Sequence, residues 1–103
     1  MATELARFDW PAPWGAVTDG MQDAFEAELT KEIGSSHGLF GQRATATARS
    51  LEQDDVLFAL ADDRVAEVHL TWNRKTESDP RWPRVTLYSS PREWAADKAR
   101  SAI

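Results

Sequence analysis

Apolar side chains recur along the chain with two different spacings, and each spacing predicts a type of element. Between Asp19 and Ile33 they recur every fourth residue, which places them on one face of an α-helix. The stripe consists of Met21, Phe25, Leu29 and Ile33, with Ala24 beside them. Asp19 followed by Gln22 matches a capping box, and Gly34 is a typical residue after a helix end. We therefore expect a helix from Asp19 to Ile33.

Four later segments have the composition or the period of β-strands. Residues 43–50 alternate Thr with Ala, and residues 84–90 begin with alternating apolar and polar side chains. Residues 55–62 are apolar at both parities, which is typical of a central strand covered on both faces. Residues 64–72 alternate strictly, so we expect one set of side chains to face the core. That set is Ala66, Val68, Leu70 and Trp72.

The turn between the second and third of these strands decides which residues pair. A two-residue loop would place Phe58 opposite the charged Glu67, which is a poor match. A three-residue loop from Asp62 to Arg64 instead places Phe58 opposite Val68, and Arg64 would then take the left-handed position. The sequence therefore predicts the three-residue loop, with the further pairs Val56–Leu70 and Leu60–Ala66.

Both ends of the chain carry further signals. Ser90, Pro91 and Glu93 form a capping box, so a second helix should begin there. Its inward-facing residues would be Trp94, Ala95, Ala99 and Ala102. Residues 1–17 contain two positions restricted by a following Pro and three aromatic side chains, which predicts an extended arm that lies on the domain. Docking of this arm on a second subunit is the alternative.

These elements together predict an α+β domain, with residues 18–103 as the single folded unit. The expected fold is a four-stranded antiparallel meander flanked by an N-terminal and a C-terminal helix, in the order α-β-β-β-β-α. Both helices would lie on one face of the sheet, and the extended aromatic arm would shield the other. A chain of 103 residues with 42% hydrophobic content is consistent with one core.

Composition narrows the classes of function. The chain has no cysteine, which excludes disulfides, thiolate nucleophiles and thiolate metal sites. The N-terminal residues contain no apolar signal-peptide core, and no segment reaches the length of a membrane span, so we expect a cytoplasmic protein without a membrane partner. The net charge is −5, although residues 73–103 carry seven basic and four acidic residues. This balance gives little support to nucleic-acid binding, and we expect none.

Candidate chemistry rests on a few polar positions. Glu67, His69 and Thr71 project from one face of a predicted strand, each about 7 Å from the next, and a carboxylate beside an imidazole can tune it as a general base. The same alternation is typical of any half-exposed strand. His37 and His69, the two imidazoles, are not at metal-ligand spacing, so we expect no metal and no cofactor. We expect His37 to be a solvated turn residue.

The connection over residues 73–83 is long for a link between two neighbouring strands, and such loops often carry function. Trp and Arg are enriched at binding hot spots. Trp82 would either be displayed in this loop or fold back on Trp72 or Trp94. The basic and aromatic residues of the connection are Arg74, Lys75, Arg81 and Trp82.

We therefore expect a non-catalytic protein-interaction module that binds another protein or a second copy of itself. The alternative is a small-molecule-binding protein or an enzyme with a pocket between the sheet and the arm, using His69 and Glu67. The sequence does not identify the ligand. The expected binding residues are Trp72, Arg74, Lys75, Arg81, Trp82, Arg84, His69 and Glu67.

Five short segments stand out between His37 and Trp94: HGLFG at 37–41, DDVLF at 54–58, HLTW at 69–72, WP at 82–83 and SPREW at 90–94. Together they resemble a group of small uncharacterised bacterial proteins of about this length. In that group the first segment has the form HxLFG with Pro often at the second position, where this chain has Gly38. The resemblance implies a cytoplasmic single-domain protein and brings no assigned activity.

Overall fold

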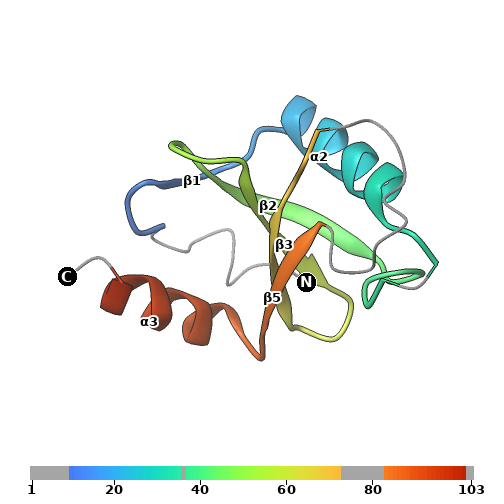
Figure 1. The fold of residues 1–103 in the computed structure, drawn as a ribbon. Helices are drawn as coiled ribbons and strands as arrows, with labels where there is room; N and C mark the ends of the chain where they lie inside the picture. Colours follow the sequence, from blue (N-terminus) through green and yellow to red (C-terminus); the bar gives the residue numbers. More distant parts are fainter. Residues whose placement is uncertain (1–9, 36, 73–82, 102–103) are drawn as a thin grey trace.

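The computed structural model of the protein describes residues 10–35, 37–72 and 83–101. Within them, one antiparallel sheet has the strand order β1-β2-β3-β4-β5, and two helices pack on it (Figure 1). The elements in chain order are β1 (Trp14–Ala16), α2 (Asp19–Glu32), β2 (Ala44–Ser50), β3 (Asp55–Leu60), β4 (Val65–His69), β5 (Arg84–Tyr88) and α3 (Pro91–Ser101).

The predicted α+β class and the antiparallel meander are confirmed, but the sheet has five strands and not four. The additional strand comes from the predicted arm, where β1 pairs with β2 through Trp14 opposite Ser50. The flanking Pro residues bias this segment to extended backbone, and that conformation also suits an edge strand. The observed element order is therefore β-α-β-β-β-β-α.

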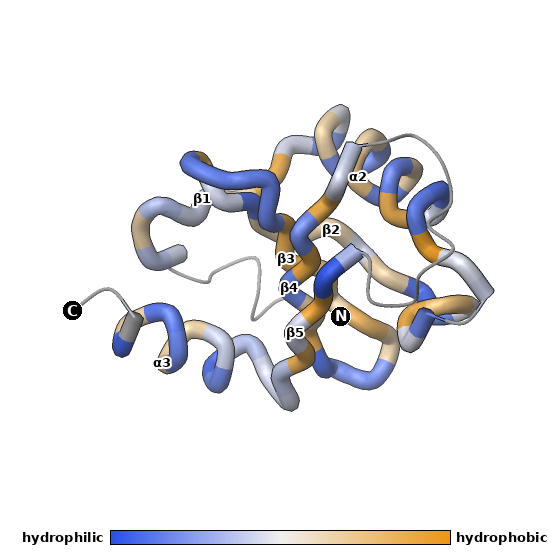
Figure 2. The backbone as a smooth tube through the Cα atoms, in the orientation of Figure 1, coloured by the Kyte–Doolittle hydropathy of each residue, from blue (hydrophilic) through white to orange (hydrophobic). Residues whose placement is uncertain are grey.

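The two helices lie on opposite faces of the sheet, so the expectation that they share one face is wrong (Figure 1). Central strand β3 is the reason, because it carries apolar side chains at both parities. Val56 and Phe58 pack in a cluster with Phe25 of α2, whereas Leu57 packs in a cluster with Trp94 of α3. Figure 2 shows the hydrophobic positions concentrated along the sheet between the helices.

Strand β2 contributes buried side chains to both faces of the sheet, because its register with β3 shifts between Ala46 and Ala48. Ala46 pairs with Phe58 and belongs to the α2 face, whereas Ala48 pairs with Leu57 and belongs to the α3 face. Thr47 occupies the irregularity, and its hydroxyl donates a hydrogen bond of 3.0 Å to the Leu57 carbonyl. Simple alternation predicted both Ala side chains on one face, and the shift reverses that for one of them.

Helix α2 is anchored to the backbone of β2 by its own side chains. The Gln22 amide donates to the carbonyl of Ala46 at 3.0 Å, and the N–H of Ala46 donates to the Glu26 carboxylate at 2.9 Å. The expected capping box at Asp19 is wrong, because Thr18 is the N-cap residue and makes no side-chain capping bond. Gln22 therefore fastens the helix to the sheet and does not cap it.

The β3–β4 hairpin keeps the predicted parity but not the predicted pairs. Phe58 lies opposite Ala66, two residues from the expected Val68. The loop is Ala61–Asp63, closed by a hydrogen bond of 2.9 Å from the Leu60 N–H to the Arg64 carbonyl. Asp63 has the left-handed backbone, with φ 70°, which Asp tolerates better than Arg does. A shift of two residues moves no side chain to the other face, so the core assignment survives.

The predicted start of the second helix is confirmed, because Ser90 caps it as expected. The Ser90 hydroxyl accepts a hydrogen bond of 3.1 Å from the N–H of Glu93, and the Glu93 carboxylate accepts one of 2.9 Å from the N–H of Ser89. These bonds fix the direction of α3 as it leaves the sheet. Trp94, in its first turn, is consequently directed into the core and is fully buried.

Trp94 lies at the centre of the second core, which is the hydrophobic cluster on the α3 face of the sheet. Its ring meets those of Trp10 and Trp14 edge to face, with centroids 5.6 and 4.9 Å apart. Its indole nitrogen donates to the Glu67 carboxylate at 2.9 Å. One side chain therefore joins the arm, the sheet and the last helix.

We predict that Trp94→Ala lowers the free energy of unfolding by about 3–5 kcal/mol, because it removes a buried aromatic ring. The measurement is urea denaturation followed by circular dichroism. Leu51→Ala is the control, since Leu51 is 68% exposed and its truncation should change stability by about 0.5 kcal/mol or less. Equal effects of the two substitutions would contradict this account of the second core.

Candidate functional site

Two hollows meet at the end of the sheet where β3 begins, β4 ends and β5 begins. Both are lined in part by Gln53 and Asp55. The first, which we call the Trp72 pocket, has a volume of about 340 Å³ and lies on the α2 face. The second, which we call the His69 hollow, has a volume of about 280 Å³ and lies on the opposite face. We call this shared region the Trp72 end of the sheet.

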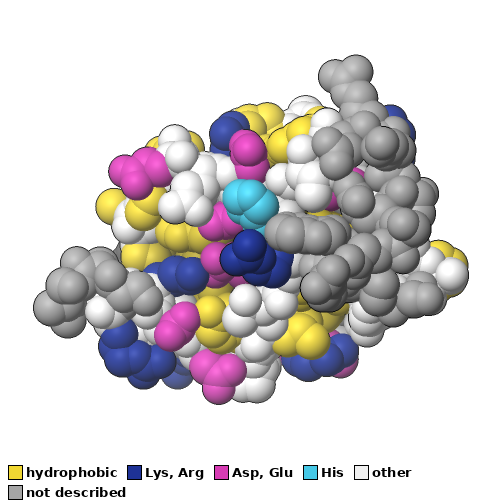
Figure 3. All heavy atoms as spheres, viewed as in Figure 1, with side chains coloured by type: hydrophobic (Ala, Val, Ile, Leu, Met, Phe, Trp, Pro, Cys, Tyr) yellow, Lys and Arg dark blue, Asp and Glu magenta, His cyan; other side chains and the backbone are white. Residues whose placement is uncertain are grey.

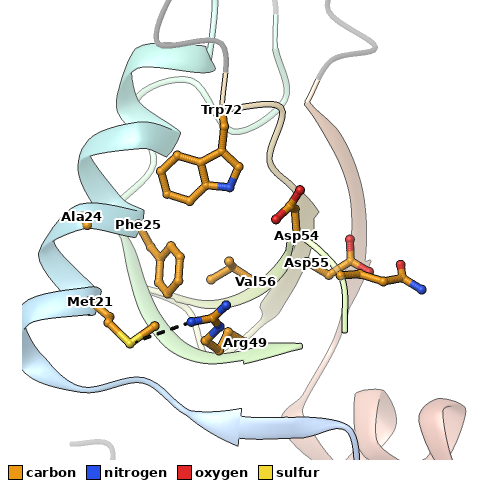
Figure 4. A pocket seen from close by; sticks show the side chains of 9 residues that line it. Met21, Ala24, Phe25, Arg49, Asp54, Asp55, Val56 and Trp72 are labelled. Carbon is orange, nitrogen blue, oxygen red and sulfur yellow. Dashed lines mark hydrogen bonds between the residues drawn. The ribbon is translucent and has the colours of Figure 1, made fainter. Parts of the chain in front are cut away.

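The Trp72 pocket combines apolar walls with a few charged groups. Figure 4 shows the rings of Trp72 and Phe25 on the helix side, with Arg49 below and Asp54 across the opening. The guanidinium carbon of Arg49 lies 5.6 Å from the centroid of the Phe25 ring. The lining residues are Met21, Ala24, Phe25, Arg49, Gln53, Asp54, Asp55, Val56 and Trp72.

Trp72 departs from its predicted place in the core. Ala66, Val68 and Leu70 are buried as expected, but β4 ends at His69 and Trp72 is 39% exposed. Its backbone is left-handed, with φ 58°, which turns the side chain out of the strand alternation. The ring packs on Phe25 with centroids 5.9 Å apart, so one face is covered and the rest borders the pocket.

A buried carboxylate holds this unusual backbone in place. Glu32, the last residue of α2, is fully buried and accepts hydrogen bonds from the N–H groups of Thr71 at 2.9 Å and Trp72 at 2.8 Å. A left-handed non-glycine residue is energetically unfavourable, so such bonds are needed to fix it. The helix thereby determines the orientation of Trp72.

Glu32 also has unusual proton chemistry. Burial raises its pKa to about 7, and a hydrogen bond with the side chain of buried Glu28 acts in the same direction. The N–H groups of Thr71 and Trp72 oppose the shift without cancelling it. Neither acid was expected from the sequence to be buried, although each lies three residues after a core residue of the helical stripe, at Phe25 and Leu29.

The His69 hollow contains an imidazole–carboxylate pair, but not the predicted one. Nδ1 of His69 lies 2.7 Å from Oδ1 of Asp55, its cross-strand neighbour on β3. Glu67 is engaged elsewhere, since it accepts bonds from Trp94 and from Lys98, the latter at 2.6 Å. His69 is half-exposed. Figure 3 shows a histidine at the surface with acidic and basic side chains beside it.

The remaining predicted residues have different outcomes. Arg84 lies opposite His69 in the β4–β5 pair and lines the same hollow, so these two residues are brought together. Trp72 lies on the other face of the same end. Glu67 has a structural role, because it joins β4 to Trp94 and Lys98 of α3. The other predicted binding residues, which are Arg74, Lys75, Arg81 and Trp82, lie outside the described residues.

His37 is buried, so its predicted solvation is wrong. Its Nδ1 accepts a hydrogen bond of 3.0 Å from the N–H of Leu39, which leaves Nε2 to donate to the carbonyl of Pro83 at 2.9 Å. This pattern requires the neutral ring with its proton on Nε2. His37 therefore ties the turn after α2 to the start of β5.

Two kinds of feature are absent from the described part of the chain. Residues 10–35, 37–72 and 83–101 contain no group of three or more His, Asp or Glu side chains placed to hold a metal ion. The helices in these ranges are too short or too polar to cross a bilayer.

Comparison with known proteins gave no match among family models, curated proteins or solved structures. The resemblance to small bacterial proteins stays a prediction.

We predict that Glu32→Gln flattens part of the dependence of stability on pH. Because the pKa of Glu32 is raised from 4.5 to about 7 on folding, its protonation stabilises the fold fully below pH 4.5, and this contribution is lost as pH rises through 7. The free energy of unfolding should therefore fall over this range in the wild type relative to the variant, by about 3 kcal/mol.

The measurement is urea denaturation at a series of pH values. Glu52→Gln, at an exposed position after β2, is the control and should follow the wild-type profile. Parallel profiles for wild type and Glu32→Gln would show that folding does not raise the pKa of Glu32.

Proposed function

We propose that the protein is a non-catalytic interaction module that binds another protein through the Trp72 end of the sheet. The observation that carries this proposal is the fixed, half-exposed Trp72 ring, bordered by the pocket and held by buried Glu32. Aromatic side chains beside pockets are typical centres of protein interfaces. A ring that is already held in place loses little conformational freedom when a partner covers it.

Two arginine side chains make this end of the sheet suitable for a partner with acidic groups. Arg49 and Arg84 both line its hollows, one on each face of the sheet. The sequence places three further basic residues between β4 and β5, and we propose that they extend the same surface. Complementary charge of this kind acts mainly on the association rate, so binding should weaken as salt rises.

The hydrogen-bond partners in the His69 hollow support the non-catalytic reading. Within the described part of the chain, the side chain of His69 is bonded to Asp55 and to no hydroxyl that could act as a nucleophile. Arg84 stands opposite it as a cation suited to binding.

We predict that a photo-cross-linking amino acid at position 53, which is exposed, lines both hollows and leaves Trp72 intact, captures one partner in cells. The same amino acid at Ala61 is the control, because Ala61 is exposed in the β3–β4 loop at the other end of the sheet. The position-53 adduct should be absent from the control and should decrease between about 50 and about 500 mM salt. An adduct of twice the chain mass identifies a second copy as the partner.

Identical adducts from the two positions, or none from position 53 in a folded protein, would overturn the proposal. Circular dichroism of both labelled proteins establishes that they are folded.

A second candidate function is acid–base catalysis in the His69 hollow. The favouring observation is the 2.7 Å contact of His69 with Asp55, because a carboxylate on Nδ1 fixes the orientation of a catalytic imidazole. Arg84 would bind an anionic substrate there.

This candidate predicts a measurable turnover that His69→Gln abolishes. Thr45→Ala, at an exposed position on β2, is the control and should leave turnover unchanged. A turnover that persists in His69→Gln would exclude His69 as the base.

A further inference from the structure

We propose that the Trp72 pocket binds a small organic carboxylate that has an apolar body. The inference goes beyond the protein-binding proposal and does not depend on it, because it concerns the interior of the pocket and not the surface around it. The pocket volume of about 340 Å³ falls within the range of small-molecule sites, about 300–1,000 Å³.

Arg49 is the first reason for a carboxylate. The interactions of its guanidinium within the described residues are with the face of Phe25, at 5.6 Å, and with the Met21 sulfur, a weak acceptor 4.0 Å from Nη1. No carboxylate of these residues lies within ion-pair distance of it. Its guanidinium therefore has donors left for a ligand, and a carboxylate matches their fork geometry.

The indole of Trp72 supplies a second donor. Figure 4 shows its ring nitrogen on the edge directed across the pocket toward Asp54, away from the helix. The hydrogen bond of Trp72 within the described residues is made by its backbone N–H to Glu32. The indole N–H is thus placed to donate to a ligand that also contacts Arg49.

The acidic residues of the pocket do not remove this preference. Asp55 is already paired with His69 on the other face of the sheet, at 2.7 Å. Asp54 is exposed at the rim, where water screens its charge. Arg49 is partly buried, so its charge acts more strongly on a group inside the pocket.

The walls account for the apolar body. Met21, Phe25 and Val56 present side chains to the cavity from α2 and β3, and Trp72 closes the side opposite Val56 (Figure 4). A ring or short alkyl chain placed there would bury apolar surface, whereas a simple inorganic anion would leave these walls in water.

The test uses three probes that share one body and differ in charge: 3-phenylpropionate, 3-phenylpropanamide and 3-phenylpropylamine. Binding is followed by NMR through the indole N–H signal of Trp72, assigned with Trp72→Phe, and the Nε–H signal of Arg49. We expect the carboxylate to shift both signals with a Kd of about 1 mM or tighter, and the amide and the amine to bind at least about tenfold more weakly.

Arg49→Gln should weaken binding of the carboxylate by about tenfold or more, whereas Arg43→Gln should not change it. Arg43 is the matched control because it is exposed just before β2 and does not line the pocket. Tighter binding of the amine would show that Asp54 sets the preference. Equal binding of the amide, or no shift with any probe at about 20 mM, would also overturn the proposal. If Arg49→Gln fails to fold, the relative affinities of the three probes for the wild-type protein still test the proposal.

Discussion

The burial of central strand β3 on both faces is the constraint on which the rest of the structure depends. Phe58 and Leu57 are adjacent in sequence and both completely buried, yet they point in opposite directions. A sheet with such a strand needs a cover on each side, and two short helices on one face would leave the other in water. Helix α2 covers one face. Trp94 of α3 covers the other, together with Trp14 of the arm.

Burial also explains how the fold produces a candidate site. Helix α2 ends at the Trp72 end of the sheet, and its last residue, Glu32, directs its carboxylate at the backbone beyond β4. A buried carboxylate without partners would be strongly destabilising, and the N–H groups of Thr71 and Trp72 provide the partners. The same bonds turn Trp72 out of the strand and open a pocket beside Phe25. One interaction thus satisfies a buried group and presents an aromatic surface.

The candidate site could be predicted from the sequence only in outline. Trp72, His69 and Arg84 were chosen from strand alternation and residue type, and they do lie at one end of the sheet. Arg49 was not chosen, because nothing local distinguishes it from other Arg residues; its role comes from the position of α2 above β2. Asp55 was expected only as the first residue of a strand, but cross-strand pairing makes it the partner of His69. Contacts between strands depend on register, which the sequence constrains only to the correct parity.

The sequence by itself determined the type and approximate bounds of the main elements, since periodicity, capping residues and turn residues are local properties. It determined that β3 is central and that Ala66, Val68 and Leu70 face inward, because alternation is enforced by strand geometry. Only the tertiary structure decided which face each helix covers. It also made the arm residues a strand, because they pair with β2. It also decided that Glu32 is buried and Trp72 half-exposed. These outcomes depend on which surfaces meet, and the free energy of burying a side chain is set by its neighbours in space rather than by its neighbours in sequence.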